Sequence, residues 1–191
     1  MLYGTGAELE RAVGTTLRDA GFAVTELDEH LGDTSSADLL VSYGPQRRLV
    51  EVKSAGGNAG EGLVAALQRH LQTWPQLRPS EPVGGGVLIV NHQHRRGHAE
   101  RTPAVYSRQA FVSALSVPVL STLQLFNWWR NSDRVAIRRA VLSPASDKPD
   151  AEAAPNATAT APATAPDVEL RGPNRGDRGW RGWLSRRASA E

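Results

Sequence analysis

The sequence contains no cysteine and very little lysine, and each shortage limits what the protein can be. Without cysteine the chain cannot form a disulfide, use a thiol nucleophile or build a thiolate zinc cluster. Only two of its 22 basic residues are lysines, Lys53 and Lys148, so a lone lysine in the folded part calls for a specific role. No stretch is long and apolar enough for a membrane span, and the first residues lack a signal-peptide pattern. We therefore expect a cytoplasmic protein without a membrane span.

Length and composition favour one folded domain followed by a tail. The chain has 191 residues, of which 40% are hydrophobic and 22% are charged. It can therefore bury one core of roughly 100–150 residues, with about 40 residues left over. From Ser146 onward alanine, proline and threonine dominate. We expect a folded domain over residues 1–145, a disordered linker over 146–170 and a flexible tail over 171–191.

The segment from Arg171 to Arg187 contains six arginines and two tryptophans in a glycine-rich setting. Clustered arginines can bind nucleic acid or a membrane surface, whereas Trp180 and Trp183 are also typical of a peptide that docks on another protein. A passive, solvated tail is the remaining alternative. We expect residues 146–191 to be dispensable for folding and to strengthen binding to nucleic acid or to an acidic partner.

Helix-like and strand-like periodicities alternate through the first 145 residues, which predicts a layered α/β domain. Thr5 and Glu8 form a capping-box pattern for a first helix that Gly21 ends. A polar loop is expected up to Ser36. The expected strands are Phe22–Leu27, Ala37–Tyr43, Arg48–Ser54, Val87–Asn91 (central) and Val117–Leu120. The later expected helices are Leu63–Trp74 (ending before Pro75), Ser107–Leu115, and one capped by Thr122 that carries Leu125, Phe126 and Trp129, giving the order αβββαβαβα.

The second and third strands bring together charged residues that can carry chemistry. Glu51 and Lys53 project from one face of the third strand, because side chains alternate along a strand, and Val52 points into the core. The hairpin turn Gly44–Arg47 places Asp38 opposite this pair. Two carboxylates with a backbone carbonyl, here that of Val52, form a hard oxygen site suited to Mg²⁺ or Mn²⁺. A neighbouring lysine can position or deprotonate a water, so the set is suited to hydrolysing a phosphodiester.

Several segments of the chain resemble the PD-(D/E)XK, or restriction-endonuclease-like, nuclease superfamily, and in particular its bacterial domains of poorly defined role. The resemblance covers roughly residues 3–130. It implies a restriction-endonuclease-like αβββαβ core, to which this chain adds a C-terminal helix-strand-helix and a disordered tail. It also implies that Asp38 and Glu51 are metal ligands, Lys53 the catalytic lysine and Glu10 an additional acid. The matching blocks are Gly6-Ala7-Glu8-Leu9-Glu10, Gly21-Phe22, Ala37-Asp38-Leu39-Leu40-Val41, Glu51-Val52-Lys53-Ser54, Leu88-Ile89-Val90-Asn91 and Leu120-Ser121-Thr122-Leu123-Gln124-Leu125-Phe126.

Helical geometry favours Glu10 over Glu8 as the acid from the first helix. At about 100° per residue, Glu10 lies roughly 60° from the centre of the buried face and Glu8 roughly 140° away. Related domains often carry a glutamine and a basic residue on the second helix, and this chain offers Gln68, Arg69 and His70. His70 shares the face of the apolar residues, so it is the favoured member of the site.

Three of the five histidines fall between residues 92 and 98. A zinc site is one interpretation of this loop. The absence of cysteine and the neighbouring arginines favour a basic loop instead, in which Arg95, Arg96 and Arg101 contact phosphate groups. Of Trp128 and Trp129, at least one is expected in the core rather than as a base-stacking surface.

These features together predict a Mg²⁺- or Mn²⁺-dependent nuclease, with DNA favoured over RNA as its substrate. Cleavage would be structure-directed or non-specific, and the sequence does not distinguish endonuclease from exonuclease. Sequence-specific cutting would require a homodimer or a separate recognition partner. The alternative function is a catalytically degenerate nucleic-acid-binding or assembly module that keeps the nuclease fold.

Overall fold

The computed structural model describes residues 1–27 and 37–143. The chain divides into two units, Met1–Glu152 and Ala153–Glu191, and all described residues belong to the first. The predicted polar loop, residues 28–36, lies outside the described residues. The predicted linker and tail, residues 146–191, lie outside them too.

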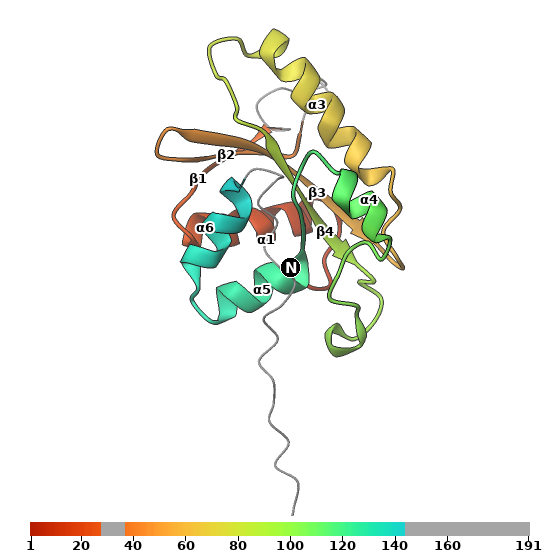
Figure 1. Ribbon diagram of the computed structural model, residues 1–191. Coiled ribbons are helices and arrows are strands. Elements are labelled where there is room, and N and C mark those ends of the chain that lie inside the picture. Colours follow the sequence, from red (N-terminus) through yellow and green to blue (C-terminus); the bar gives the residue numbers. More distant parts are fainter. Residues whose placement is uncertain (28–36, 144–191) are drawn as a thin grey trace, which may run out of the picture. The chain divides into compact units, whose positions relative to one another are not determined.

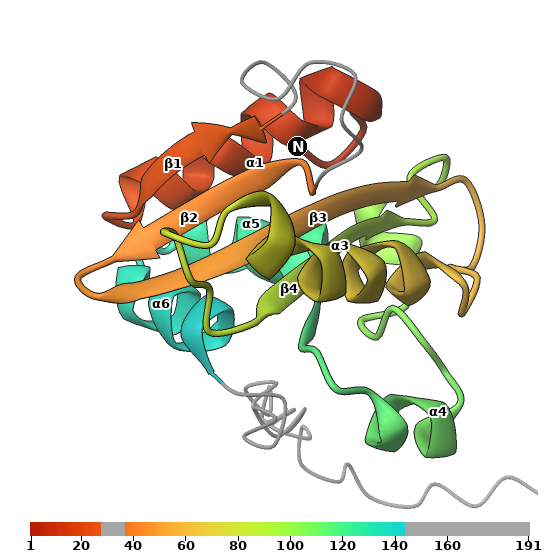
Figure 2. The same ribbon diagram turned by 90° about the horizontal axis from the view of Figure 1, so that it is seen from above.

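The domain is built on a five-stranded mixed sheet with the order β1-β2-β3-β4-β5 (Figures 1 and 2). The first three strands pair antiparallel, and β3, β4 and β5 pair parallel. The strand predicted to be central is β4, which is buried along its whole length between β3 and β5, although β3 holds the middle of the order. The strands are β1 (Ala23–Glu26), β2 (Leu39–Tyr43), β3 (Gln46–Ala55), β4 (Gly86–His92) and β5 (Val119–Ser121).

Five α-helices and one short 3₁₀ helix are described around this sheet, which confirms a mixed α/β domain. They are α1 (Gly6–Asp19), α3 (Leu63–Leu77), η1 (His98–Glu100), α4 (Gln109–Ala114), α5 (Thr122–Arg130) and α6 (Arg134–Leu142). The predicted helix-strand-helix after β4 is present as α4, β5 and α5.

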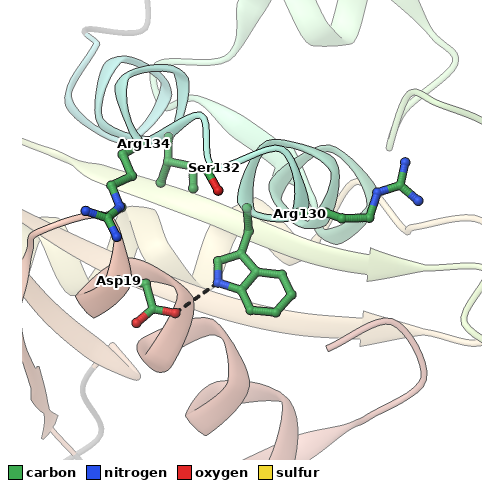
Figure 3. A pocket seen from close by; sticks show the side chains of 7 residues that line it. Asp19, Arg130, Ser132 and Arg134 are labelled. Carbon is green, nitrogen blue, oxygen red and sulfur yellow. Dashed lines mark hydrogen bonds between the residues drawn. The ribbon is translucent and has the colours of Figure 1, made fainter.

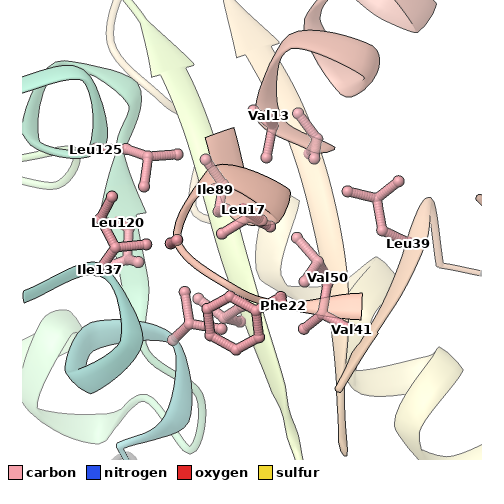
Figure 4. Packing of buried hydrophobic residues seen from close by; sticks show 14 of the residues in the cluster. Val13, Leu17, Phe22, Leu39, Val41, Val50, Ile89, Leu120, Leu125 and Ile137 are labelled. Atoms are coloured by element: carbon pink, nitrogen blue, oxygen red, sulfur yellow. The ribbon is translucent and has the colours of Figure 1, made fainter. Parts of the chain in front are cut away.

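The helices divide between the two faces of the sheet. Residues of α1, α5 and α6 pack on one face, against Val50 and Val52 of β3 (Figure 4). Residues of α3 and α4 pack on the other face, against Leu49 of β3. Because side chains alternate along a strand, Glu51 and Lys53 share the face of Leu49 and lie on the α3 side. The predicted orientation of Val52 into the core is confirmed.

The predicted end of α3 was wrong, and one helix of the structure, α6, was not predicted. Helix α3 does not end before Pro75 but continues to Leu77. Proline removes one helix hydrogen bond. This loss is tolerated near the end of α3 because the buried side chain of Trp74 anchors that end of the helix. The Trp74 indole N–H donates to the Glu81 carbonyl at 2.7 Å. Helix α6 was not predicted, although Asp133 accepts a hydrogen bond from the Ala136 N–H and caps its start.

Two predicted caps differ in detail. Thr5 precedes α1 but makes no side-chain capping hydrogen bond. Ser121, not Thr122, caps α5 by accepting from the Gln124 N–H. The Thr122 hydroxyl instead donates to the side-chain oxygen of Asn91 on β4 at 2.9 Å, so it joins β4 to α5.

Candidate active site

Asp38 lies where β2 and β3 separate. The last pair of the β2–β3 ladder is Leu39 with Val50, and β3 then continues alone on that side. The Oδ2 atom of Asp38 accepts a hydrogen bond from the Val52 N–H at 2.6 Å. Because a residue in a strand directs its N–H and its carbonyl to the same side, the Val52 carbonyl also faces Asp38. The hairpin therefore gathers a carboxylate and a carbonyl at one edge, as predicted.

Lys53 lies between the two predicted carboxylates. Its Nζ atom is 2.7 Å from Oε1 of Glu51 and 3.6 Å from Oδ2 of Asp38. The Glu51 side chain is 3% exposed, whereas that of Lys53 is 33% exposed. Glu51 is thus covered by protein, whereas the lysine ammonium is the part of this pair that is open to solvent.

The surroundings of Lys53 raise its pKa above the usual value for lysine. Burial acts in the opposite direction and is the largest single contribution, but the hydrogen bond with Glu51 and the negative charges of Asp38, Glu51 and Glu10 together outweigh it in setting the pKa. Lys53 is therefore an ammonium group at neutral pH. Of the two roles predicted for Lys53, positioning a water or deprotonating it, a charged ammonium is suited only to the first.

His70 reaches the cluster from α3. It belongs to the buried stripe of this helix, together with Leu67 and Trp74, and its Nε2 atom is 3.7 Å from Oε2 of Glu51. That distance is longer than a hydrogen bond, but it places the His70 ring beside the buried carboxylate. Gln68, in contrast, donates to the Ser116 hydroxyl.

Glu10 lies on the partly buried side of α1, whereas Glu8 is exposed. The predicted orientation of the two side chains is confirmed. The negative charge of Glu10 contributes to the raised pKa of Lys53, so helix α1 adds to the field at the hairpin cluster. The structure thus brings together Glu10, Asp38, Glu51, Lys53 and His70 from three segments of the chain.

The donor chemistry of this cluster fits a hard divalent cation. Asp38 and Glu51 supply two carboxylates, and the Val52 carbonyl faces the same side as Asp38. Among the described residues, no group of three or more His, Cys, Asp or Glu side chains is arranged to hold a metal ion. Mg²⁺ nevertheless usually keeps several waters and takes only one or two protein carboxylates, so a carboxylate pair and a carbonyl are sufficient for it.

Two loops lie side by side just beyond Lys53. The backbone N–H of Gln93 donates to the Gly57 carbonyl at 2.8 Å, and that of His94 donates to the Ala55 carbonyl at 3.2 Å. Arg95 lies over Gly56, since a Cβ atom added there would be 3.0 Å from Arg95 Nε. Arg95 and Arg96 are exposed, so their side chains reach solvent beside the cluster, and their contact with phosphate stays a prediction.

Arg101 has a different environment, at odds with its predicted contact with phosphate. It is 6% exposed, and its guanidinium donates to the side-chain oxygen of Asn91 and to the carbonyls of Leu2, His94 and Arg96 at 2.8–3.1 Å. Arg101 therefore ties the N-terminal segment to the loop that carries Arg95. The sequence offered one signal for this network, a polar Asn91 at the end of an apolar strand.

The histidines of residues 92–98 do not converge on a metal. A ring nitrogen of His92 bonds to the Thr102 carbonyl at 2.7 Å, and one of His98 bonds to the Tyr3 hydroxyl at 3.4 Å. The basic-loop interpretation is the one these contacts favour.

In the part of the chain that the structure describes, no helix has the length and apolar character needed to cross a bilayer. No protein family matches the chain, and no curated protein or solved structure is significantly similar to it.

Proposed function

We propose that the domain is a metal-dependent nuclease of the PD-(D/E)XK type that hydrolyses phosphodiester bonds, with DNA favoured over RNA. The observation that carries this proposal is the Lys53 ammonium held between the Asp38 and Glu51 carboxylates where β2 and β3 separate. The element order α1-β1-β2-β3-α3-β4 is consistent with the core of that superfamily.

Each residue of the cluster has a role that follows from its contacts. Asp38, Glu51 and the Val52 carbonyl would hold Mg²⁺ or Mn²⁺, which when bound would polarise the phosphate and acidify a water. The Lys53 ammonium would offset negative charge that develops on the phosphate. His70, 3.7 Å from the Glu51 carboxylate, would help to position it, and the charge of Glu10 helps to keep Lys53 protonated.

Arg95 and Arg96 would hold the nucleic-acid backbone beside the cluster. Phosphate contacts of this kind position a strand without reading its sequence, which supports structure-directed or non-specific cleavage. Sequence-specific cutting would require a second copy of the chain or a separate recognition subunit.

One observation favours a second function. The Lys53 ammonium contacts both the Asp38 and the Glu51 carboxylate, so it offsets part of their negative charge without a metal. A catalytically degenerate nucleic-acid-binding or assembly module that keeps this arrangement is therefore the alternative.

A cleavage assay separates the two functions. Linear, nicked, supercoiled and single-stranded DNA would be incubated with Mg²⁺ or Mn²⁺ and the wild-type chain, Asp38→Ala or Lys53→Ala. The nuclease proposal expects wild-type cleavage that both substitutions abolish. Cleavage that persists in both variants would indicate a contaminant, and binding without cleavage under every condition would support the degenerate module.

A matched pair of glutamate variants adds a control. Glu10→Gln should slow cleavage, whereas Glu8→Gln, on the exposed side of the same helix, should leave it unchanged. In a Mn²⁺ titration followed by the thermal midpoint, wild type should be stabilised and Glu51→Gln should lose most of that gain. Equal stabilisation of both proteins would refute a metal site built on Glu51.

A further inference from the structure

A hollow of about 490 Å³ lies between the end of α1, the end of α5 and the start of α6 (Figure 3). We call it the α5–α6 pocket. The residues that line it include Asp19, Trp129, Arg130, Ser132 and Arg134. It is distinct from the proposed active site, because α1 ends at Asp19 near the start of β1, and the register places that end of the sheet beside the start of β3 rather than beside Lys53.

Trp129 presents a fixed aromatic surface in this pocket. Its indole N–H donates to the Asp19 carboxylate at 2.9 Å, and its ring centroid is 6.0 Å from that of Phe126. Trp129 is nevertheless 44% exposed. A large aromatic ring that is held in place and still reaches solvent is suited to stacking against a flat ligand.

Two arginines line the pocket together with this ring. In Figure 3 the labelled side chains of Arg130 and Arg134 lie on opposite sides of the pocket. Both side chains are exposed, and neither guanidinium forms an ion pair with a carboxylate of the described residues. Their positive charge is therefore available to a ligand.

The short connection between α5 and α6 creates this arrangement. Helix α5 ends at Arg130 and α6 begins at Arg134. Ser132 adopts a left-handed conformation with φ of 58°, and its N–H donates to the Trp129 carbonyl at 2.9 Å. The turn therefore reverses the chain directly beside Trp129. Arg130 precedes the turn and Arg134 follows it.

We infer that the α5–α6 pocket binds a nucleotide of single-stranded nucleic acid, with its base stacked on Trp129 and the phosphates on its two sides contacting Arg130 and Arg134. In a single strand every internal base lies between two phosphates, which matches an aromatic ring in a pocket that has a guanidinium group on each of two opposite sides. Stacking of bases on aromatic side chains together with cationic contacts to the backbone is the common mode of single-strand binding. Arginine also matches the geometry of phosphate oxygens.

The carboxylate of Asp19 is the opposing charge in the pocket, and its hydrogen bond to the indole engages one of its oxygens. Two guanidinium groups against one carboxylate leave the pocket net positive. An acidic protein segment would satisfy the charges but has no need of the exposed ring. This proposal does not rest on the proposed cleavage reaction, because it concerns binding at another place in the domain.

Binding is measured with the full chain in EDTA, so that no cleavage contributes. The probe is a fluorescent oligothymidylate of about ten nucleotides, titrated by anisotropy at about 50 and about 200 mM salt. Trp129→Leu should weaken binding about 5- to 100-fold, and Trp129→Phe should weaken it less because a ring remains. Arg130→Gln and Arg134→Gln should each make the salt dependence shallower by about 0.7 in logarithmic slope.

Arg139→Gln is the matched control, because Arg139 is an exposed arginine of α6 that does not line the pocket. It should leave affinity almost unchanged. Asp19→Asn should tighten binding, since it removes a charge that repels phosphate while its amide oxygen can still accept from the indole. A 5-iodouracil oligonucleotide should form a photo-crosslink at Trp129, detected by mass spectrometry. Thermal midpoints establish that each variant is folded.

Three outcomes would overturn the inference. In the first, Arg139→Gln weakens binding as much as Arg130→Gln and Arg134→Gln, which would indicate a diffuse basic surface. In the second, Trp129→Leu binds like wild type and no crosslink forms at Trp129. In the third, a glutamate-rich peptide of equal charge displaces the oligonucleotide as well as unlabelled oligothymidylate does, which would identify an acidic protein segment as the ligand.

Discussion

The Nζ atom of Lys53 lies 2.7 Å from Oε1 of Glu51, and both side chains project from the same face of β3. The pair joins a carboxylate that is almost fully covered to an amine that is partly open to solvent. Its strength therefore depends on keeping the amine charged, which makes the cluster sensitive to high pH.

Lys53→Met tests this dependence. The pKa of Lys53 is raised above 10.5 in the folded protein, so its contribution to stability is fully present below about that pH and is lost as the pH rises through the folded-state pKa. The variant should be about 1–3 kcal/mol less stable than wild type at neutral pH. This loss is smaller than the loss from breaking a fully buried ion pair, because the Lys53 side chain is 33% exposed. In urea unfolding, the wild-type and variant stabilities should converge above the folded-state pKa. A constant difference across that range would contradict the assigned charge state.

Arg101→Lys should destabilise the domain by about 2–4 kcal/mol, because lysine cannot reproduce the planar set of donors and several buried carbonyls would lose their partner. Arg96→Lys, at an exposed position of the same loop, should change stability by less than about 0.5 kcal/mol. Chemical denaturation of both proteins measures the difference. Similar losses in the two variants would show that Arg101 has no special structural role.

Gly86→Ala should destabilise the domain by about 1–3 kcal/mol through overpacking. A Cβ atom at Gly86 would lie 2.8 Å from Leu67 Cδ1 and 3.1 Å from the Leu49 carbonyl oxygen. Gly57→Ala is the control, since nothing lies within 4 Å of a Cβ atom built there, and it should be nearly neutral. The thermal midpoints of the two variants give the comparison, and equal midpoints would argue against close packing of α3 on β4.

Truncation after Pro144 tests the predicted tail. The last described helix ends at Leu142, so the thermal midpoint should remain nearly unchanged. If the arginines of residues 171–187 bind nucleic acid, DNA affinity should fall more at low salt than at high salt. Affinity that stays constant at every salt concentration would leave a protein-docking or passive tail, and unfolding of the truncated chain would contradict the predicted domain boundary.

Much of the candidate site was predictable because it depends on local periodicity. Alternation along β3 sets Glu51 and Lys53 on one face, and helical spacing sets Glu10 and His70 toward the interior. To apply strand alternation or helical spacing, one needs to know only whether a segment is a strand or a helix and which of its faces is buried. The contact between Asp38 and the Val52 N–H was not predictable in this way, because it depends on where the β2–β3 ladder stops.

Other features depended on tertiary contacts that sequence patterns do not record. Proline at position 75 normally predicts a helix end, but the packing of Trp74 carries α3 past it. Arg101 and Arg95 look equivalent in sequence, yet one is buried among carbonyls and the other is exposed. Helix α6 had usable signals in Asp133 and in the buried Ile137, Ala140 and Val141, and could have been found from them.

The hairpin origin of the cluster also has a consequence for the order of folding. Asp38, Glu51 and Lys53 all belong to or adjoin one β2–β3 hairpin, whereas the parallel pairing of β3 with β4 must close a loop that contains α3. Short-range contacts generally form before long-range ones, so the two carboxylates would approach each other before α3 covers them. Lys53 would then reduce their repulsion during folding itself. In stopped-flow experiments Lys53→Met should therefore refold more slowly than wild type, in addition to any increase in its unfolding rate.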